Sequence, residues 1–194
     1  GVRVFPGGAG DGQDDDRARR RIAAAAGVAQ ECGVRVLVET HDSHPRGADV
    51  ARVLDGPWPD GAVGAIWDAA HPWVAGEEPA DTWRVLAPWL ASVQIKDVAE
   101  RRVGATPALV GHGVLPWGEI TDVLRVGGYA GPMNLEWEKP WHDGLPELDV
   151  ALGAAASWLP SVASPHPDRA RPDRAHPDRP HHRPPRHDPP HEEA

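Results

Sequence analysis

The stretch VRVLVETHDSH, residues 34–44, decides the fold. It starts as a run of β-branched and aliphatic residues, which is typical of a strand buried in a parallel sheet. The run ends at Glu39, and two histidines and an aspartate follow within five residues. A carboxylate in that place is either a metal ligand at the mouth of a barrel or the first solvated residue after a strand. The rest of the chain decides between these two interpretations.

Strand-like and helix-like segments alternate along the chain. The other apolar runs suited to strands lie at 2–5, 62–67, 92–96 and 132–137. The stretches suited to helices lie between and after them, at 14–31, 47–55, 80–90, 117–127 and 145–159. Strands and helices that alternate in this way predict βα units on a parallel sheet.

Polar residues stand at the ends of four of these strands: Glu39, Asp68, Gln94 with Lys96, and Glu136. An open sheet would spread such side chains along one edge at about 5 Å per strand. In a (β/α)8 barrel the carboxyl ends of the strands converge on one mouth, where active sites lie. Convergence favours the barrel, so we predict an α/β fold of the (β/α)8 TIM barrel type.

The same four strand ends predict a metal site. Taken singly each residue is weak evidence, because Glu39 also fits an ordinary exposed position and Asp68 a turn or helix cap. Together two Glu, one Asp and a fourth oxygen or nitrogen donor form an octahedral site for a hard divalent cation. We expect Mn²⁺ or Mg²⁺ there, with Co²⁺ and Zn²⁺ as alternatives.

Composition sets further bounds. The chain has 194 residues, 40% of them hydrophobic, enough for one domain, which we place at residues 1–163. We expect no membrane span and no secretion leader, and the single cysteine, Cys32, favours a cytoplasmic protein with a small buried thiol. The net charge of −9 arises before residue 165, because the six Arg after it balance four Asp and two Glu. An acidic body argues against nucleic acid as the partner.

Residues 164–194 form a second segment, rich in Pro, His, Arg and Asp, in which PDR recurs at 167, 172 and 177. It contains no aliphatic residue larger than Ala after residue 164. Such a segment buries too little surface to offset its ordering entropy, so we expect a disordered tail.

Six stretches of the chain together resemble a known family. They are VRVFPGG at 2–8, VLVETHDSH at 36–44, IWDAAHPW at 66–73, VQIKD at 93–97, LVGHGVLPW at 109–117 and MNLEWE at 133–138. In this order they are similar to the sugar phosphate isomerase/epimerase family of xylose isomerase-like TIM barrels. The resemblance covers nearly all of residues 1–160 and implies that the chain carries the last five of eight βα units.

The resemblance implies a cation held by Glu39, Asp68, Gln94 and Glu136, with His71 reaching the substrate. Two departures matter: the family most often has His in place of Gln94 and an acidic residue in place of His112. The neutral carbonyl oxygen of Gln suits a hard cation. The 3-dehydroshikimate dehydratase branch of the family also looks similar in using Gln there. Gln94 therefore weakens the prediction of an isomerase more than the prediction of a metal site.

The implied function is a divalent-metal-dependent isomerase or epimerase. It would act on a small hydroxy-ketone sugar, sugar phosphate or cyclitol through an enediolate, with Glu39 and Glu136 moving the proton. The first alternative is a dehydratase or lyase of the 3-dehydroshikimate type. The second is an inactive, truncated barrel that acts only as a binding module. A nuclease is the weakest option, given the acidic body.

Several other residues are candidates for the substrate pocket. Lys96 either forms a salt bridge at the mouth or contacts the substrate. Arg102 has a guanidinium that can hold an anion, and Trp73 an indole face that can stack on a sugar. We expect His41 and His44 to be loop histidines that face solvent.

The missing strands carry a prediction of their own. A barrel that lacks three strands has two unpaired edges, and we therefore expect the chain to be poorly stable or to form a homo-oligomer. Size-exclusion chromatography with thermal melting checks this. A compact monomer that melts cooperatively would contradict the prediction. Because the chain opens with Gly1 rather than Met, directly into a strand-like segment, we also expect it to begin downstream of its natural start.

Overall fold

The computed structural model describes residues 1–9 and 12–163, within one compact unit that spans Gly1–Ser164. The segment expected to be a disordered tail, 164–194, lies outside the described residues. Of the helices that the structure describes, none combines the length and apolar character needed to cross a membrane.

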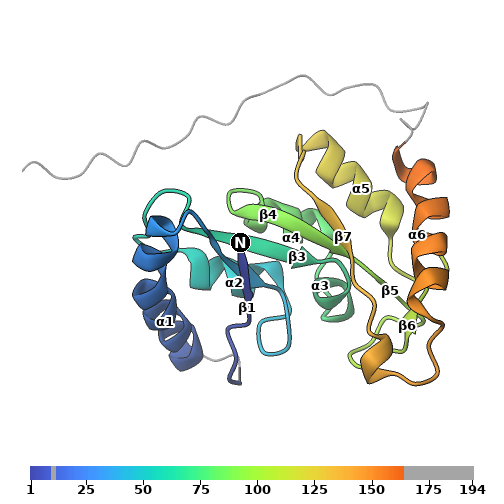
Figure 1. Ribbon diagram of the computed structural model, residues 1–194, viewed down its shortest axis with the longest axis horizontal. Coiled ribbons are helices and arrows are strands. Elements are labelled where there is room, and N and C mark those ends of the chain that lie inside the picture. Colours follow the sequence, from blue (N-terminus) through green and yellow to red (C-terminus); the bar gives the residue numbers. More distant parts are fainter. Residues whose placement is uncertain (10–11, 164–194) are drawn as a thin grey trace, which may run out of the picture. The chain divides into compact units, whose positions relative to one another are not determined.

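Five parallel strands form the central sheet, in the order β1-β2-β3-β4-β7 (Figure 1). Their bounds are Val2–Val4 (β1), Val36–Glu39 (β2), Val63–Asp68 (β3), Leu90–Ile95 (β4) and Met133–Leu135 (β7). Each strand pairs with the neighbour that precedes it in this order, as in a βα barrel. The five strands form a curled half-barrel. The predicted α/β TIM barrel fold and all five predicted strand positions are therefore confirmed.

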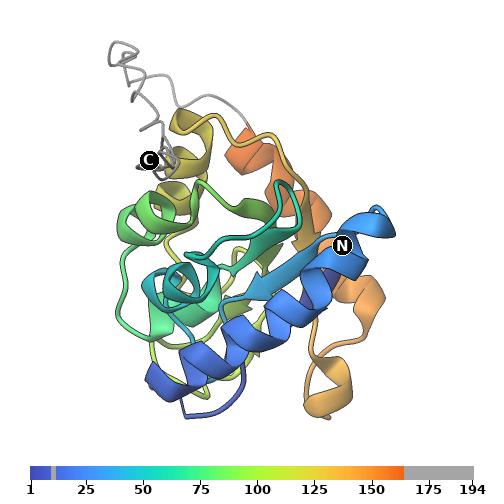
Figure 2. The ribbon, with the colours of Figure 1, turned by 90° about the vertical axis from the view of Figure 1, so that its left-hand side faces the viewer.

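A row of helices covers one face of the sheet. The helices are Gly12–Glu31 (α1), Gly47–Leu54 (α2), Ala70–Val74 (α3), Pro79–Leu86 (α4), Trp117–Val126 (α5) and Leu148–Ala163 (α6). Contacts join α1 to α2, α2 to α4, α4 to α5 and α5 to α6, which is the order of the strands they follow. Figure 1 shows α1 and α6 at opposite ends of this row, and Figure 2 shows α1 in front of the strands.

The alternation of side chains along each strand separates the core from the site. In β2, Val36 and Val38 belong to the hydrophobic core that packs against the helices. Leu37 and Glu39 therefore face the opposite, concave side, because successive residues of a strand point to opposite faces. The concave side carries the polar residues that the sequence places at the strand ends.

Four small elements were not predicted. They are α3, the 3₁₀ helix Lys139–Trp141 (η1), and an antiparallel pair formed by Asp97–Val98 (β5) and Pro107–Ala108 (β6). Segments of two to five residues are too short to leave a periodic pattern in the sequence.

Asp97 anchors the long connection after β4. Its side chain is buried and accepts hydrogen bonds from the backbone N–H groups of Val98, Gly111, Gly113 and Leu115 at 2.9 to 3.1 Å. A Cβ on Gly113 would lie 2.1 Å from the Asp97 carboxylate, so only glycine allows this close approach. One carboxylate thereby closes the loop from residue 98 to residue 115.

The expectation of a buried Cys32 was wrong. Cys32 is exposed in the turn after α1. The buried stripe of α1 runs through Ala18, Ile22, Ala26 and Ala29, and the helix ends at Glu31, one residue before Cys32. The helix ends here because Gly33 adopts a positive φ of 67°.

Replacing Asp97 with Ala should destabilise the protein by roughly 2–5 kcal/mol, because four backbone donors lose their acceptor. Asp97→Asn keeps one acceptor oxygen and should cost less. Urea unfolding measures both, with Asp60→Ala, at an exposed turn, as the control. A loss for Asp97→Ala no larger than that of the control would contradict the anchoring role.

Candidate metal centre

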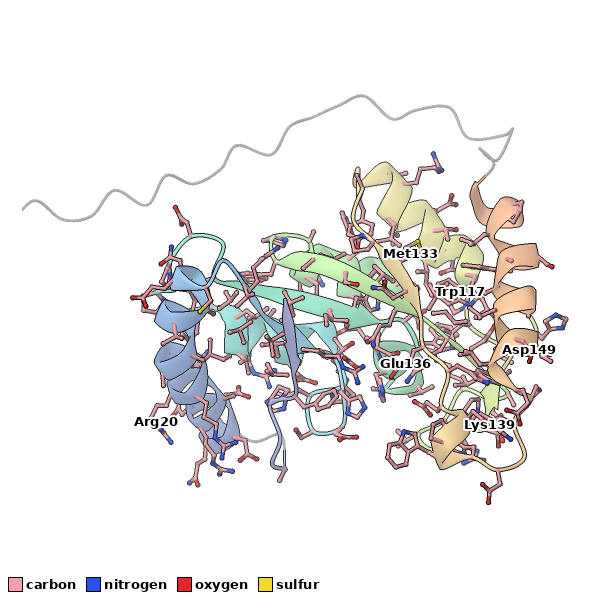
Figure 3. The ribbon with its side chains drawn as sticks, viewed as in Figure 1. Arg20, Trp117, Met133, Glu136, Lys139 and Asp149 are labelled. Atoms are coloured by element: carbon pink, nitrogen blue, oxygen red, sulfur yellow. The ribbon has the colours of Figure 1, made fainter. Side chains whose placement is uncertain are left out.

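Strand register brings the candidate ligands together. Asp68 at the end of β3 pairs directly with Gln94 of β4, and Gln94 pairs in turn with Asn134 of β7. Two residues further along, the Glu136 N–H donates to the carbonyl oxygen of Ile95 at 3.0 Å. Figure 3 shows Glu136 just beyond the end of β7. Glu39 ends β2, so four neighbouring strands supply one site.

Three carboxylates meet at this point. Glu39, Asp68 and Glu136 each present an oxygen, and these oxygens lie within 4.8 Å of one another. Glu39 and Asp68 are fully buried, and the side chain of Glu136 is 18% exposed. Oxygens at this spacing can be inner-sphere ligands of one cation.

Five buried oxygens at the strand ends make no regular hydrogen bond, and three of them have only ion contacts with Lys96 or Arg3. They are both carboxylate oxygens of Glu39, Oδ2 of Asp68, Oε1 of Gln94 and Oε2 of Glu136. Buried polar atoms are nearly always paired, so such a concentration of incompletely satisfied acceptors suits a further, positively charged partner. All five are the hard oxygen donors that Mg²⁺ and Mn²⁺ prefer. The residues present therefore fit a divalent cation.

Two cationic side chains stand among these carboxylates. The Lys96 ammonium lies 2.8 Å from Oδ2 of Asp68 and 3.7 Å from Oε2 of Glu136. It also donates to Oε1 of Glu138 at 3.0 Å. On the other side, Nη1 of Arg3 lies 3.1 Å from Glu39 and 3.4 Å from Glu136. The protein itself thus offsets part of the negative charge.

The excess of negative charge that remains shifts the pKa values of Glu39, Glu136 and Lys96. Burial, with the negative charges of Asp68 and Glu136, raises the pKa of Glu39 to about 8. Burial and the charge of Asp68 also raise the pKa of Glu136. Burial lowers the pKa of Lys96, but the surrounding carboxylates outweigh this effect and raise it overall. The lysine is therefore a permanent cation, whereas the two glutamates favour a proton or a positive ligand.

Backbone contacts fix the orientation of Asp68. Its Oδ1 accepts hydrogen bonds from the N–H groups of Ala70 at 2.8 Å and His71 at 3.3 Å, at the start of α3. The hydroxyl of Thr40 accepts a hydrogen bond from the Asp68 N–H at 3.0 Å. With Oδ1 engaged in this way, Oδ2 is left to face the cluster.

His71 lies at the rim of the cluster as a neutral imidazole. Its Nε2 is 3.4 Å from the Lys96 ammonium and 3.7 Å from Oδ2 of Asp68. Burial and the positive charges of Lys96 and His41 lower the pKa of His71 to about 3. Because the ammonium can only donate, Nε2 acts as an acceptor and the ring proton resides on Nδ1.

The structure changes the interpretation of the two loop histidines. His41 packs between Phe5 and His71 with its ring tilted against both, at centroid distances of 4.4 and 4.5 Å, so it belongs to the rim of the site. His44 is fully buried rather than solvated, and its Nε2 lies 2.8 Å from Asp15 of α1. The Asp15 carboxylate satisfies the ring and makes its burial possible.

The other two substrate candidates lie in different surroundings. The Trp73 ring is covered by the Arg101 guanidinium, whose carbon lies 3.3 Å from the ring centroid. Arg102 is exposed and pairs with Glu100 at 2.8 Å. The Arg101 contact links the 97–115 connection to α3, whereas the Arg102 pair lies within that connection. The substrate roles of Trp73 and Arg102 stay predictions.

Three residues of the site were missed in the sequence. They are Arg3, Glu138 and His41. Glu138 follows Glu136 and His41 follows Glu39 at a spacing of two, and that spacing is the signal that identifies them. Arg3 has no such neighbour in sequence and reaches the site by pairing with Leu37 of β2.

Comparison with known proteins identifies the family. A family model described as xylose isomerase-like TIM barrel matches residues 1–162. The chain belongs to this family. A search of curated proteins found no match.

Several solved structures share the fold at low identity. The probable 3-DHS dehydratase AsbF of Bacillus anthracis matches with a TM-score of 0.66 and 19% identity, over 82% of this chain and 62% of its own. D-psicose 3-epimerase of Clostridium cellulolyticum, solved with D-tagatose, gives 0.58 and 18%, over 77% and 55%. The IOLI protein with a bound zinc atom gives 0.69 and 13%, over 83% and 62%. The chain thus spans less than two thirds of each.

Replacing Glu39 with Gln should stabilise the metal-free protein at alkaline pH. The folded state holds the Glu39 proton up to about pH 8, whereas the unfolded chain releases it near 4.5, so this group's contribution to stability is complete below pH 4.5 and is lost as the pH rises through 8. Gln mimics the protonated form. The gain should reach roughly 1–4 kcal/mol at pH 8.5 and vanish near pH 4.

Unfolding with EDTA present measures this gain, and Glu119→Gln on the exposed side of α5 is the control. A Glu39→Gln variant that is less stable than the wild type at pH 8.5 would contradict the electrostatic account.

Proposed function

We propose that the chain forms the metal-binding part of a divalent-metal-dependent isomerase or epimerase that acts on a hydroxy-ketone sugar or cyclitol. The observation that carries this proposal is the set of five buried oxygens without hydrogen bonds, drawn from four strand ends. Membership of the xylose isomerase-like family and structural neighbours named as epimerases support it.

Four residues would hold the ion: Glu39, Asp68, Gln94 and Glu136. Mn²⁺ and Mg²⁺ suit these oxygen donors best. When bound, the ion supplies Lewis acidity that polarises a ketone and the hydroxyl beside it. Lys96 and Arg3 hold the carboxylates in place through the contacts described above, so the ligand oxygens are ordered before the ion arrives.

Glu39 and Glu136 are the residues proposed to move the proton. They come from β2 and from the segment after β7, on opposite sides of Asp68 and Gln94 in the strand order. One carboxylate removes the proton from the carbon next to the ketone, and the other returns it. Return to the opposite face of that carbon gives epimerisation, and return to the neighbouring carbon gives isomerisation.

His71 is placed to orient the substrate. The lowered pKa of His71 keeps its ring neutral. Its Nδ1–H is left as a donor because Nε2 faces Lys96. A neutral donor can hold a substrate oxygen without adding a charge to the site.

The second candidate function is a dehydratase of a cyclic hydroxy-keto acid. Gln94 favours it by resemblance, and the probable 3-DHS dehydratase AsbF has the same fold. The third candidate is a barrel that binds partners and catalyses nothing. Unlike the two enzymes, it should hold no stoichiometric Mn²⁺ after desalting.

Glu136→Gln should lower turnover by at least about 100-fold, because it removes a proposed acid–base group, while the protein keeps its melting temperature. A screen of ketohexoses, inosose-like cyclitols and 3-dehydroshikimate with Mn²⁺ measures turnover, and titration with Mn²⁺ alone measures binding. The variant should also bind Mn²⁺ at least about tenfold more weakly, since it loses one anionic ligand. Asp81→Asn, an exposed partner of Arg84, is the control. Turnover retained by Glu136→Gln would refute its proposed role.

A further inference from the structure

The Lys96 ammonium has no donor left for a ligand. It has three N–H groups. Its three nearest polar neighbours, Oδ2 of Asp68 at 2.8 Å, Oε1 of Glu138 at 3.0 Å and Nε2 of His71 at 3.4 Å, account for all of them. The side chain is only 8% exposed. A lysine beside a metal site would ordinarily attract an anionic substrate, but this one is fully engaged inside the protein.

Charges around the site balance once a divalent ion is present. In the part of the chain that the structure describes, four carboxylates cluster here, those of Glu39, Asp68, Glu136 and Glu138. The two permanent cations in contact with them are Lys96 and Arg3. A divalent ion offsets the two remaining negative charges. The loaded site then has no surplus positive charge with which to hold a carboxylate or phosphate.

Glu138 is the one member of this set that is not needed as a ligand. Its Oε1 faces Lys96, and its Oε2 lies 3.5 Å from Nε2 of His142, away from the three clustered carboxylates. Its side chain is 28% exposed, so it borders the outside of the cluster. Its charge therefore acts on the lysine and on incoming ligands.

We propose that Glu138 is a specificity-determining residue, which neutralises Lys96 and thereby restricts the site to uncharged hydroxy-ketones. The inference rests on the proposed function and deepens it. An anionic substrate would find no free ammonium at the site and would approach the Glu138 carboxylate, and like charges at short range repel. Without the Glu138 charge, Lys96 regains a donor and a net positive charge close to the metal ligands.

Two sugars that differ only at C6 provide the test. D-Fructose ends in a neutral hydroxymethyl group there, and D-fructuronate ends in a carboxylate, while the hydroxy-ketone end is the same. Binding of each to the Mn²⁺-loaded full chain is measured by calorimetry. The wild type should prefer fructose by about tenfold or more, and Glu138→Gln should reduce or reverse that preference by about tenfold or more.

Glu147→Gln is the matched control, because Glu147 forms an exposed pair with Lys139 at 3.2 Å on the same connection. It should leave the preference unchanged. Titration with Mn²⁺ alone comes first: failure of the wild type to bind the ion would refute the proposed function and this inference with it. If Mn²⁺ binds, but the wild type binds the two sugars equally, or Glu138→Gln leaves their ratio unchanged at an unaltered melting temperature, only the role of Glu138 is refuted.

Discussion

The architecture of the site depends on one buried ammonium group. Glu39, Asp68 and Glu136 come from different strands, and without compensation their burial in one cluster would be too costly for a stable fold. Lys96 reduces that cost from within the sheet, and Arg3 does so from the first strand. The compensation is incomplete, which is why buried oxygens without hydrogen bonds persist and why the pKa of Glu39 rises. Incomplete neutralisation makes the cluster receptive to a divalent cation.

Much of this arrangement can be read from the sequence, because two local rules suffice. An apolar run that ends in a carboxylate marks the carboxyl end of a buried strand, and parallel strands bring such ends to one edge. Those rules lead from Glu39, Asp68 and Glu136 to a common site, which the strand register then assembles. The helices are predictable for a similar reason, since their segments are long enough to show a pattern.

These rules do not predict which residues far apart in the sequence contact each other in the fold. Alternation indicates the face to which a side chain points, but not the residue it meets there. Lys96 and Glu138 are 42 positions apart in the chain, and His44 finds Asp15 29 positions earlier. A histidine in a short polar loop gives no local sign of that acid, so its burial could not be foreseen. Arg3 was overlooked because it occupies the middle of an apolar strand, where a guanidinium suggests an exposed edge rather than a bridge between two glutamates.

Lys96 and Asp97 are consecutive residues that serve opposite sides of the sheet. Lys96 binds the carboxylate cluster, and Asp97 gathers the amides of the following loop. One peptide unit therefore connects the carboxylate cluster to the loop that ends at residue 115. Because Lys96 and Asp97 share this peptide unit, an insertion or deletion between residues 98 and 115 that shifts Asp97 would also shift Lys96 and the carboxylates that it contacts.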